Sequence, residues 1–341
     1  MPKTGPDIGK PLKGKLTFDF AKAVRAAIRD YPAQLAATAF IDGDNSAVVA
    51  DTFADSEKGQ IAHLKEVGQF GAKYHEQIDD GTCAFAWNSE DGKSRFMFYR
   101  RPTAERNPME MPDLAMAGAA VFDHELGHMV VKRGMGNDAH QPQMCESVAD
   151  AFASIRNFQR FGQKPEALSS YSGMRAYEFF LGQESHLTTT VVDGIRLDAE
   201  SVKFMSLSPA ETAALAEEYA KNLSPATQEL VEARRVYRAV IEAQEKDGLD
   251  CEALAKTMLQ QPANSLAFKL GARALDYLVK MDPEYFNTPE WQSLRDQIKE
   301  RVDALGPSGS VLMDSGNGKN SAASDASEHT PAAPHPKRPS S

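Results

Sequence analysis

The chain of 341 residues is long enough for one large domain or two ordinary ones. Its content of 42% hydrophobic and 25% charged residues is normal for a soluble globular protein with a sizeable core. A formal net charge of −10 argues against binding to nucleic acid or to acidic membranes, because both need a basic surface.

The sequence shows no signal for a membrane or for secretion. It contains no run of about 18 apolar residues that could span a membrane, and residues 1–6 lack the apolar core of a secretory signal. Three widely separated cysteines form no disulfide framework. We therefore expect a cytoplasmic protein without a transmembrane segment, and export by a route that reads other signals stays open.

The first part of the chain predicts a tail, two helices and a turn. Residues 1–15 are rich in Pro, Gly and Lys, which is typical of a flexible tail. Apolar residues recur at helical spacing over 18–31, and 35–41 predicts a helix end or a short strand. Asp42-Gly43-Asp44-Asn45 predicts a turn, and a further helix is expected over about 57–78.

Two aromatic-rich runs, residues 83–87 and 94–99, give the clearest strand signal. Between them lies a polar segment with Asp91-Gly92, a dipeptide typical of hairpin turns. We therefore expect a β-hairpin. It is either an ordinary part of a sheet or an edge against which an extended peptide pairs near a functional site.

The segment 113–132 predicts a helix with Asp113 as its N-cap. Within it stands H-E-x-x-H, formed by His124, Glu125 and His128. Positions four apart lie on one face of a helix, so both imidazoles can bind one metal ion. The glutamate beside them can contact a metal-bound water.

The same helix carries an apolar stripe that runs from Leu114 through Val121 into His124 and His128. We expect this stripe to be the buried face, with the histidines at a covered cleft. Gly127 lowers helix stability but permits the backbone of a neighbouring element to approach closely.

A hydrolytic zinc site has three protein ligands and leaves a fourth position for water, so the third ligand must come from elsewhere. Glu146 and Asp150 lie one turn apart on the next predicted helix, beside small alanines. We expect Glu146 to be the ligand and Asp150 to accept the second N–H of a ligand histidine. His140 is a rival third ligand. Glu-x-x-His occurs only once, which argues against a di-iron site.

This order of motifs, over residues 114–157, resembles the gluzincins, the thermolysin-like zinc metallopeptidases. Their pattern is H-E-x-x-H followed by E-x-x-x-D on the next helix. The resemblance implies an α+β zincin-like catalytic domain, one zinc ion per chain and hydrolysis of peptide or protein substrates. By this resemblance His124, His128 and Glu146 are zinc ligands. Glu125 is the general base that activates a zinc-bound water, and Asp150 orients a ligand histidine.

The chain departs from the gluzincin pattern near these motifs. Cys145 stands where those enzymes usually have asparagine, the gap between the motifs is short, and no tyrosine lies within it. The group that stabilises the transition state therefore has to come from elsewhere. His186, Tyr171 and Tyr177 are the candidates, since each could polarise the scissile carbonyl.

The rest of the chain predicts helices and a tail. Residues 171–181 are expected to be helical, and Ser208-Pro209-Ala210-Glu211 is a capping-box sequence with proline at the first helical position. Ser224-Pro225 and Thr288-Pro289-Glu290 repeat this device, so four or five helices are expected before the tail. The predicted parts are an N-terminal tail (1–15), a zincin-like domain (16–205), a helical region (206–304) and a disordered tail (305–341).

A second hypothesis belongs to another class. The chain could be a binding protein that keeps the zincin fold without catalysis, such as an exported bacterial effector. The basic end at 334–341 of an acidic chain would then be a docking or export signal. The intact Glu125 favours an enzyme, because a scaffold has no need of the base.

Overall fold

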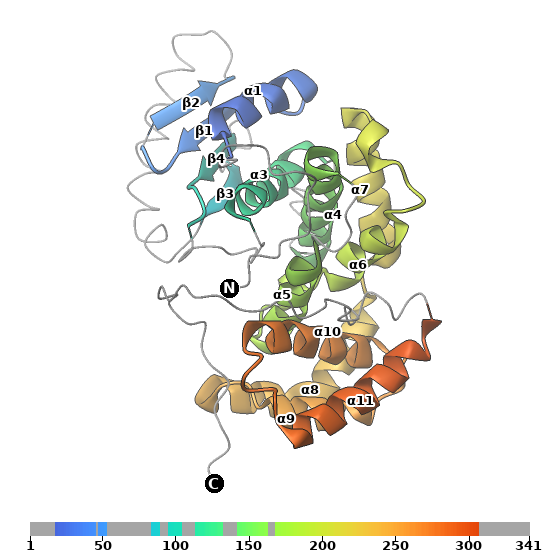
Figure 1. The fold of residues 1–341 in the computed structure, drawn as a ribbon. Helices are drawn as coiled ribbons and strands as arrows, with labels where there is room; N and C mark the ends of the chain where they lie inside the picture. The colour runs from blue at the N-terminus through green and yellow to red at the C-terminus, as the bar shows by residue number, and fades with distance from the viewer. Residues whose placement is uncertain are drawn as a thin grey trace, which may run out of the picture.

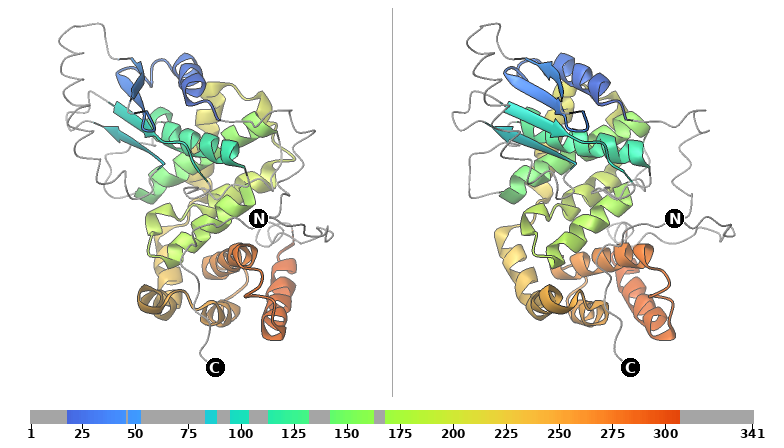
Figure 2. Two further views of the ribbon diagram at one scale, coloured as in Figure 1. Left: turned by 60° about the vertical axis from the view of Figure 1, so that its left-hand side comes forward. Right: turned by 90° about the vertical axis from the view of Figure 1, so that its left-hand side faces the viewer.

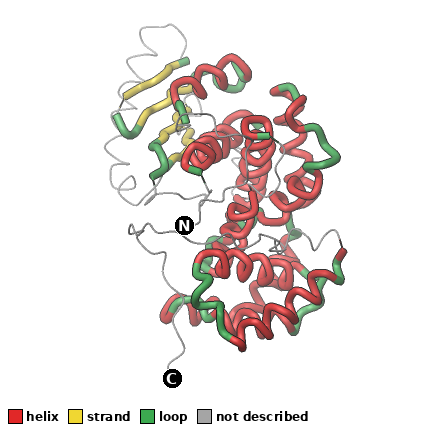
Figure 3. The backbone as a smooth tube through the Cα atoms, viewed as in Figure 1, coloured by secondary structure: helices red, strands yellow, loops and turns green. Residues whose placement is uncertain are grey.

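The computed structural model describes residues 18–45, 47–52, 83–88, 95–103, 113–131, 142–162 and 168–306. Over these residues the protein is a mixed α+β structure, mostly helical, with one small sheet of four strands (Figure 3). The sheet lies at one end of the molecule and the C-terminal helices lie at the other, as all views agree (Figure 1 and Figure 2).

Along the chain the described helices are α1 (Phe20–Asp30), α3 (Leu114–Val130), α4 (Pro142–Phe161), α5 (Ser169–Phe180), η2 (Glu184–His186), α6 (Thr189–Asp198), η3 (Phe204–Ser206), α7 (Pro209–Leu223), α8 (Thr227–Asp247), α9 (Cys251–Leu259), α10 (Leu266–Met281) and α11 (Pro289–Asp303), where η marks a 3-10 helix. The predicted helices over 18–31, 113–132 and 171–181 are confirmed as α1, α3 and α5. The helix expected over 57–78 lies outside the described residues. None of the described helices has both the length and the apolar character needed to cross a membrane.

The strands are β1 (Thr38–Asp42), β2 (Ala47–Asp51), β3 (Ala84–Asn88) and β4 (Arg95–Tyr99), in the spatial order β2-β1-β4-β3. β3 pairs antiparallel with β4, with Trp87 opposite Phe96, which confirms the predicted pairing of these two strands. The turn expected at Asp91-Gly92 lies outside the described residues. β1 runs parallel to β4 and confirms the strand alternative for 35–41. The sequence pattern does not predict β2, because five residues are too few to establish an alternating period.

One face of the sheet packs on α1 and α3. Phe40, Met97 and Tyr99 point into the main core, which these helices share. Phe20 of α1 stacks on Tyr99, with ring centroids 4.6 Å apart. α3, which carries the H-E-x-x-H motif, thus lies between the sheet and α4 (Figure 1).

α3 is buried almost all round, and its packing corrects the expectation of a single buried stripe. Every residue of α3 is buried except Leu114, Glu125 and His128. Leu114, expected to start the buried stripe, is 44% exposed because it lies at the solvent end of the helix. Asp113 caps α3 as predicted, accepting hydrogen bonds from two backbone N–H groups of the first turn.

The C-terminal region consists of five helices, α7 to α11, within the described residues, as expected. Ser208 and Thr288 cap α7 and α11 at the predicted positions. Ser224 does not start a helix. It ends α7, and α8 begins after Ala226, whose backbone N–H donates to Glu229 Oε2 at 2.9 Å. α7 packs on α4, and α10 packs on α5 (Figure 1).

A buried arginine fastens α10 to the first turn of α5. The side chain of Arg273 is 0% exposed, and it donates to the Ser169 carbonyl at 2.5 Å and to Ser172 Oγ at 3.2 Å. Asp276 and, from α6, Asp193 balance its charge at 3.2 and 3.7 Å. Since an unpaired buried charge is costly, this network fixes α5, α6 and α10 relative to one another.

Candidate metal centre

The two histidines of H-E-x-x-H lie one helical turn apart on α3 and converge on one point. His128 Nε2 lies 3.2 Å from His124 Nε2, and the rings are perpendicular. His124 is buried and His128 is half-buried. The helical spacing alone produces this geometry, because side chains four apart lie one above the other.

Glu146 of α4 completes a group of three ligand atoms. Its Oε2 lies 3.3 Å from His124 Nε2, and its Oε1 lies 3.6 Å from His128 Nε2. All three ligand atoms lie within 4.8 Å of one another. In a tetrahedral zinc site with bonds of about 2.0–2.1 Å, neighbouring ligand atoms are about 3.3 Å apart. The donor set and its spacing therefore fit one divalent metal ion.

Gly127 lets α4 come close enough for Glu146 to reach the histidines. A Cβ atom at this position would lie 2.9 Å from Ala149 Cα and 3.2 Å from the Ala149 carbonyl oxygen. Both are backbone atoms of α4 and cannot move aside as a flexible side chain would. The predicted close approach of a neighbouring backbone at Gly127 is therefore confirmed.

Asp150 is a fully buried carboxylate behind His124, and four side chains bind it. His124 Nδ1 lies 2.6 Å from its Oδ1, and the Tyr171 hydroxyl donates to the same oxygen. Arg175 donates to both oxygens, at 2.9 and 3.1 Å. Thr188 Oγ1 donates to Oδ2 at 2.5 Å. Every acceptor position of this buried group is thus engaged.

The charges of this group set the protonation of His124. Burial lowers the pKa of His124, but Asp150 and Glu146 outweigh burial and raise it to about 10. Burial raises the pKa of Asp150, but Arg175 and then His124 hold it well below its usual range. Asp150 is therefore a carboxylate that accepts the Nδ1 proton. This bond leaves Nε2 of His124 directed at the ligand group.

The Oε2 atom of Glu146 has the properties of a metal ligand. It is buried, and the imidazole nitrogens of His124 and His186 lie 3.3 and 3.6 Å from it. Burial raises the pKa of Glu146, but His124, His128 and His186 lower it to about 2. A buried carboxylate that stays ionised beside imidazole nitrogens suits metal coordination.

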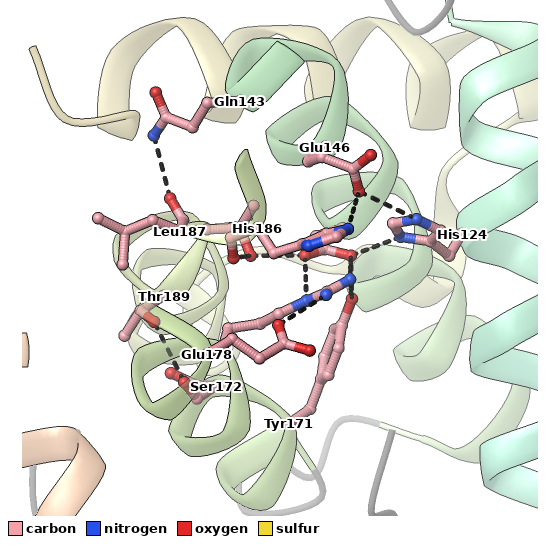
Figure 4. A network of polar contacts seen from close by, with 12 residues as sticks. His124, Gln143, Glu146, Tyr171, Ser172, Glu178, His186, Leu187 and Thr189 are labelled. Atoms are coloured by element: carbon pink, nitrogen blue, oxygen red, sulfur yellow. Dashed lines mark hydrogen bonds and ion pairs between the residues drawn. The ribbon is translucent and has the colours of Figure 1, made fainter. Parts of the chain in front are cut away.

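His186, on η2, faces Glu146 from the side away from His124. Figure 4 shows Glu146 between the His186 and His124 rings. His186 Nε2 lies 3.6 Å from Glu146 Oε2, and its side chain is 34% exposed. His186 does not belong to the group of three close ligand atoms. It therefore lies beside the candidate ligand group with part of its side chain accessible to solvent.

The two candidate tyrosines lie elsewhere. Tyr171 is fully buried, and its hydroxyl binds Asp150 and receives a hydrogen bond from Arg175 at 3.1 Å. It therefore supports the carboxylate behind His124. Tyr177 packs its ring against Tyr277 of α10, with centroids 5.7 Å apart. Of the three candidates, the structure brings His186 alone to the ligand group among the described residues.

The other residues singled out from the sequence have these placements. Glu125 directly follows the ligand His124 on α3 and is half-buried. Cys145 is a half-buried free thiol on α4. His140, the rival third ligand, lies outside the described residues.

Asp123, the residue before His124, forms a second link between α3 and α4. It is 1% exposed and accepts two hydrogen bonds from Arg160 of α4, at 2.6 and 2.8 Å. Arg156 lies 3.6 Å away. This second α3–α4 link holds the helix pair together without involving the ligand group.

Three of the side chains that bind Asp150 belong to no sequence motif. Arg175 and Tyr171 stand four apart, which places both on one face of α5, but this spacing is too common to be informative. Thr188 occupies a position that suits an ordinary helix cap. Only the fold shows that all three reach Asp150.

Comparisons with protein-family models, with curated proteins and with solved structures found no match for the chain. The chemistry of the site therefore rests on its own geometry. Two imidazoles and one carboxylate from two packed helices can hold a metal ion and leave a coordination position for water or substrate.

Proposed function

We propose that the protein is a zinc-dependent metallopeptidase of the gluzincin type, which hydrolyses peptide bonds in peptide or protein substrates. One observation carries the proposal. The ligand atoms of His124, His128 and Glu146 lie within 4.8 Å of one another, close enough to bind one metal ion, and Asp150 is hydrogen-bonded behind His124.

Each side chain has a distinct role in this proposal. His124, His128 and Glu146 would hold the zinc ion, which when bound lowers the pKa of water and polarises a carbonyl group. Glu125 takes the proton of the attacking water and passes it to the leaving nitrogen. His186 donates a hydrogen bond to the carbonyl oxygen as negative charge develops on it.

The substrate would bind in an extended form along β3. In the strand order β2-β1-β4-β3, β3 is the end strand of the described sheet. α3 packs against β3, which brings this strand close to the helix that carries the ligands. Backbone hydrogen bonds to an edge strand bind a peptide with little regard to its side chains.

The experiment is digestion of a peptide library by the full-length protein, followed by mass spectrometry. Cleavage is expected with zinc and should disappear with a chelator. The Glu125→Gln variant should bind zinc as the wild type does but cleave nothing. Glu200→Gln, at an exposed position, is the matched control and should cleave normally. Cleavage by Glu125→Gln would overturn the mechanism. Zinc binding without any cleavage by the wild type would favour the binding-protein hypothesis.

A further inference from the structure

Thr188 stands at the N-cap of α6, but it does not cap this helix. A threonine at this position normally accepts a hydrogen bond from a backbone N–H of the first helical turn. In α6 no such bond forms. The hydroxyl, on a fully buried side chain, instead donates to Asp150 Oδ2 at 2.5 Å. Thr188 is thus bound to the carboxylate that holds His124.

Thr188 is also joined to His186 through a short stretch of backbone. Its N–H donates to the His186 carbonyl at 2.8 Å, and its hydroxyl lies 3.4 Å from the same oxygen. These bonds close a tight turn between the two residues. The position of Thr188 therefore determines where η2 presents the His186 ring.

A second link holds the same turn from α4. Gln143 Nε2 donates to the Leu187 carbonyl at 3.0 Å, as Figure 4 shows. Gln143 lies on the helix that also carries Glu146 and Asp150. The turn that bears His186 is therefore held at two neighbouring residues. The Leu187 carbonyl accepts a hydrogen bond from Gln143, and the Thr188 hydroxyl donates one to the Asp150 carboxylate.

We propose that Thr188 is a positioning residue, which uses Asp150 as a shared anchor for the ligand His124 and for the turn that places His186 over the metal position. The action of His186 on a substrate rests on the proposed function. The anchoring itself does not, because it concerns only how the two histidines are held. One carboxylate thus holds both His124 and the turn that carries His186.

The test compares Thr188→Val, which keeps the shape and removes the hydroxyl, with Thr188→Ser, which keeps the hydroxyl. Thr189→Val is the matched control, because Thr189 is a buried neighbour whose hydroxyl binds only the Ser172 carbonyl among the described residues, at 3.2 Å. The full-length proteins are treated with diethyl pyrocarbonate, and mass spectrometry gives the rate at which His186 is modified relative to His335. Competition with a chromophoric chelator gives the zinc affinity.

Thr188→Val is expected to raise the modification rate of His186 severalfold and to weaken zinc binding about tenfold, as loss of a hydrogen-bond partner behind a ligand does. Thr188→Ser and Thr189→Val should match the wild type in both measurements. A wild-type modification rate in Thr188→Val would overturn the proposal, and so would an equal rise in Thr189→Val.

Gln143→Ala keeps the proposal testable if Thr188→Val does not fold, since Gln143 is only half-buried. This variant loosens the turn but leaves Asp150 and its partners in place. It should raise the modification rate of His186 without weakening zinc binding, and an unchanged rate would contradict the tethered turn.

If a substrate is found, Thr188→Val should lower kcat more than it changes KM. A protein that cleaves nothing would refute the proposed function but leave these two readouts to decide the role of Thr188.

Discussion

His124 Nδ1 lies 2.6 Å from Asp150 Oδ1, at a point where the Asp150 side chain has no contact with solvent. The Nδ1 atom of His124 is thereby bound to a buried carboxylate. The other nitrogen of the ring can face only the group formed with His128 and Glu146. The orientation of this ligand is therefore built into the packing of α3 on α4 and does not depend on a metal ion being present.

The first prediction concerns the ligands. The purified protein is expected to contain about one zinc ion per chain, as a site with three converging ligands requires. His124→Ala and Glu146→Ala should lose most of this zinc, because each removes one of the three ligand atoms. His140→Ala should keep it. Metal content is measured by inductively coupled plasma mass spectrometry after dialysis. Full zinc occupancy in Glu146→Ala would move the third ligand to His140 or Asp150.

The second prediction compares two buried aspartates. Asp150→Asn removes the charge that pairs with Arg175 and weakens the acceptor of the His124 proton. We expect zinc affinity to fall about 10- to 100-fold and stability to fall by ~3–5 kcal/mol. Asp123→Asn breaks the comparably buried pair with Arg160. It should lose stability but bind zinc as the wild type does. Chemical denaturation and chelator competition give the two quantities, and similar zinc affinities in both variants would contradict the role of Asp150.

The third prediction concerns protons. The pKa of His124 is raised from 6.5 to about 10, so its contribution to the stability of zinc-depleted protein is full below pH 6.5 and is lost as the pH rises towards 10. At pH 8 His124 therefore still carries its extra proton, and zinc binding should release about one proton per protein. A histidine with an ordinary pKa of 6.5 is already almost fully neutral at pH 8 and would release almost none. Calorimetry in two buffers with different ionisation enthalpies measures this number. Asp150→Asn should release less, and proton release that is negligible in the wild type would contradict the raised pKa.

The fourth prediction concerns the contact between α3 and α4. Gly127→Ala would raise intrinsic helix propensity by ~1 kcal/mol. The added Cβ, however, would meet the Ala149 backbone at 2.9 Å, and forcing the helices apart should cost ~1–3 kcal/mol. We expect a lower unfolding temperature and weaker zinc binding, since Glu146 moves away from the histidines. Thermal unfolding and chelator competition check both effects. A more stable variant would show that the helices separate without strain.

Much of the fold follows from local sequence signals. The caps at Asp113, Ser208 and Thr288 and the aromatic hairpin are correctly predicted, because each depends on a few residues close together in the chain. The convergence of His124 and His128 follows from helix geometry alone. Ser224 shows the limit of such signals, since a capping sequence can equally follow the end of the preceding helix.

The side chains that hold Asp150 in place cannot be predicted from local sequence signals. Tyr171, Arg175 and Thr188 belong to α5 and to the turn before α6, and nothing in their spacing points to Asp150. They reach it because α6 packs on α4 and α5 packs on α6, which is a property of the tertiary structure. α6 itself is not predicted, because its first residues, Thr189 and Thr190, are poor helix formers in isolation.

The network around Arg273 has a consequence for the smallest fragment that can work. α5 supplies two of the side chains that hold Asp150, and its first turn is gripped by an arginine that comes about one hundred residues later in the chain. A fragment ending at residue 205 would contain every metal ligand, yet it would leave Ser169, Ser172 and Asp193 without that buried partner. The helices that follow the candidate metal centre in sequence therefore help to hold it in place, and removing them would leave α5 without its buried arginine partner.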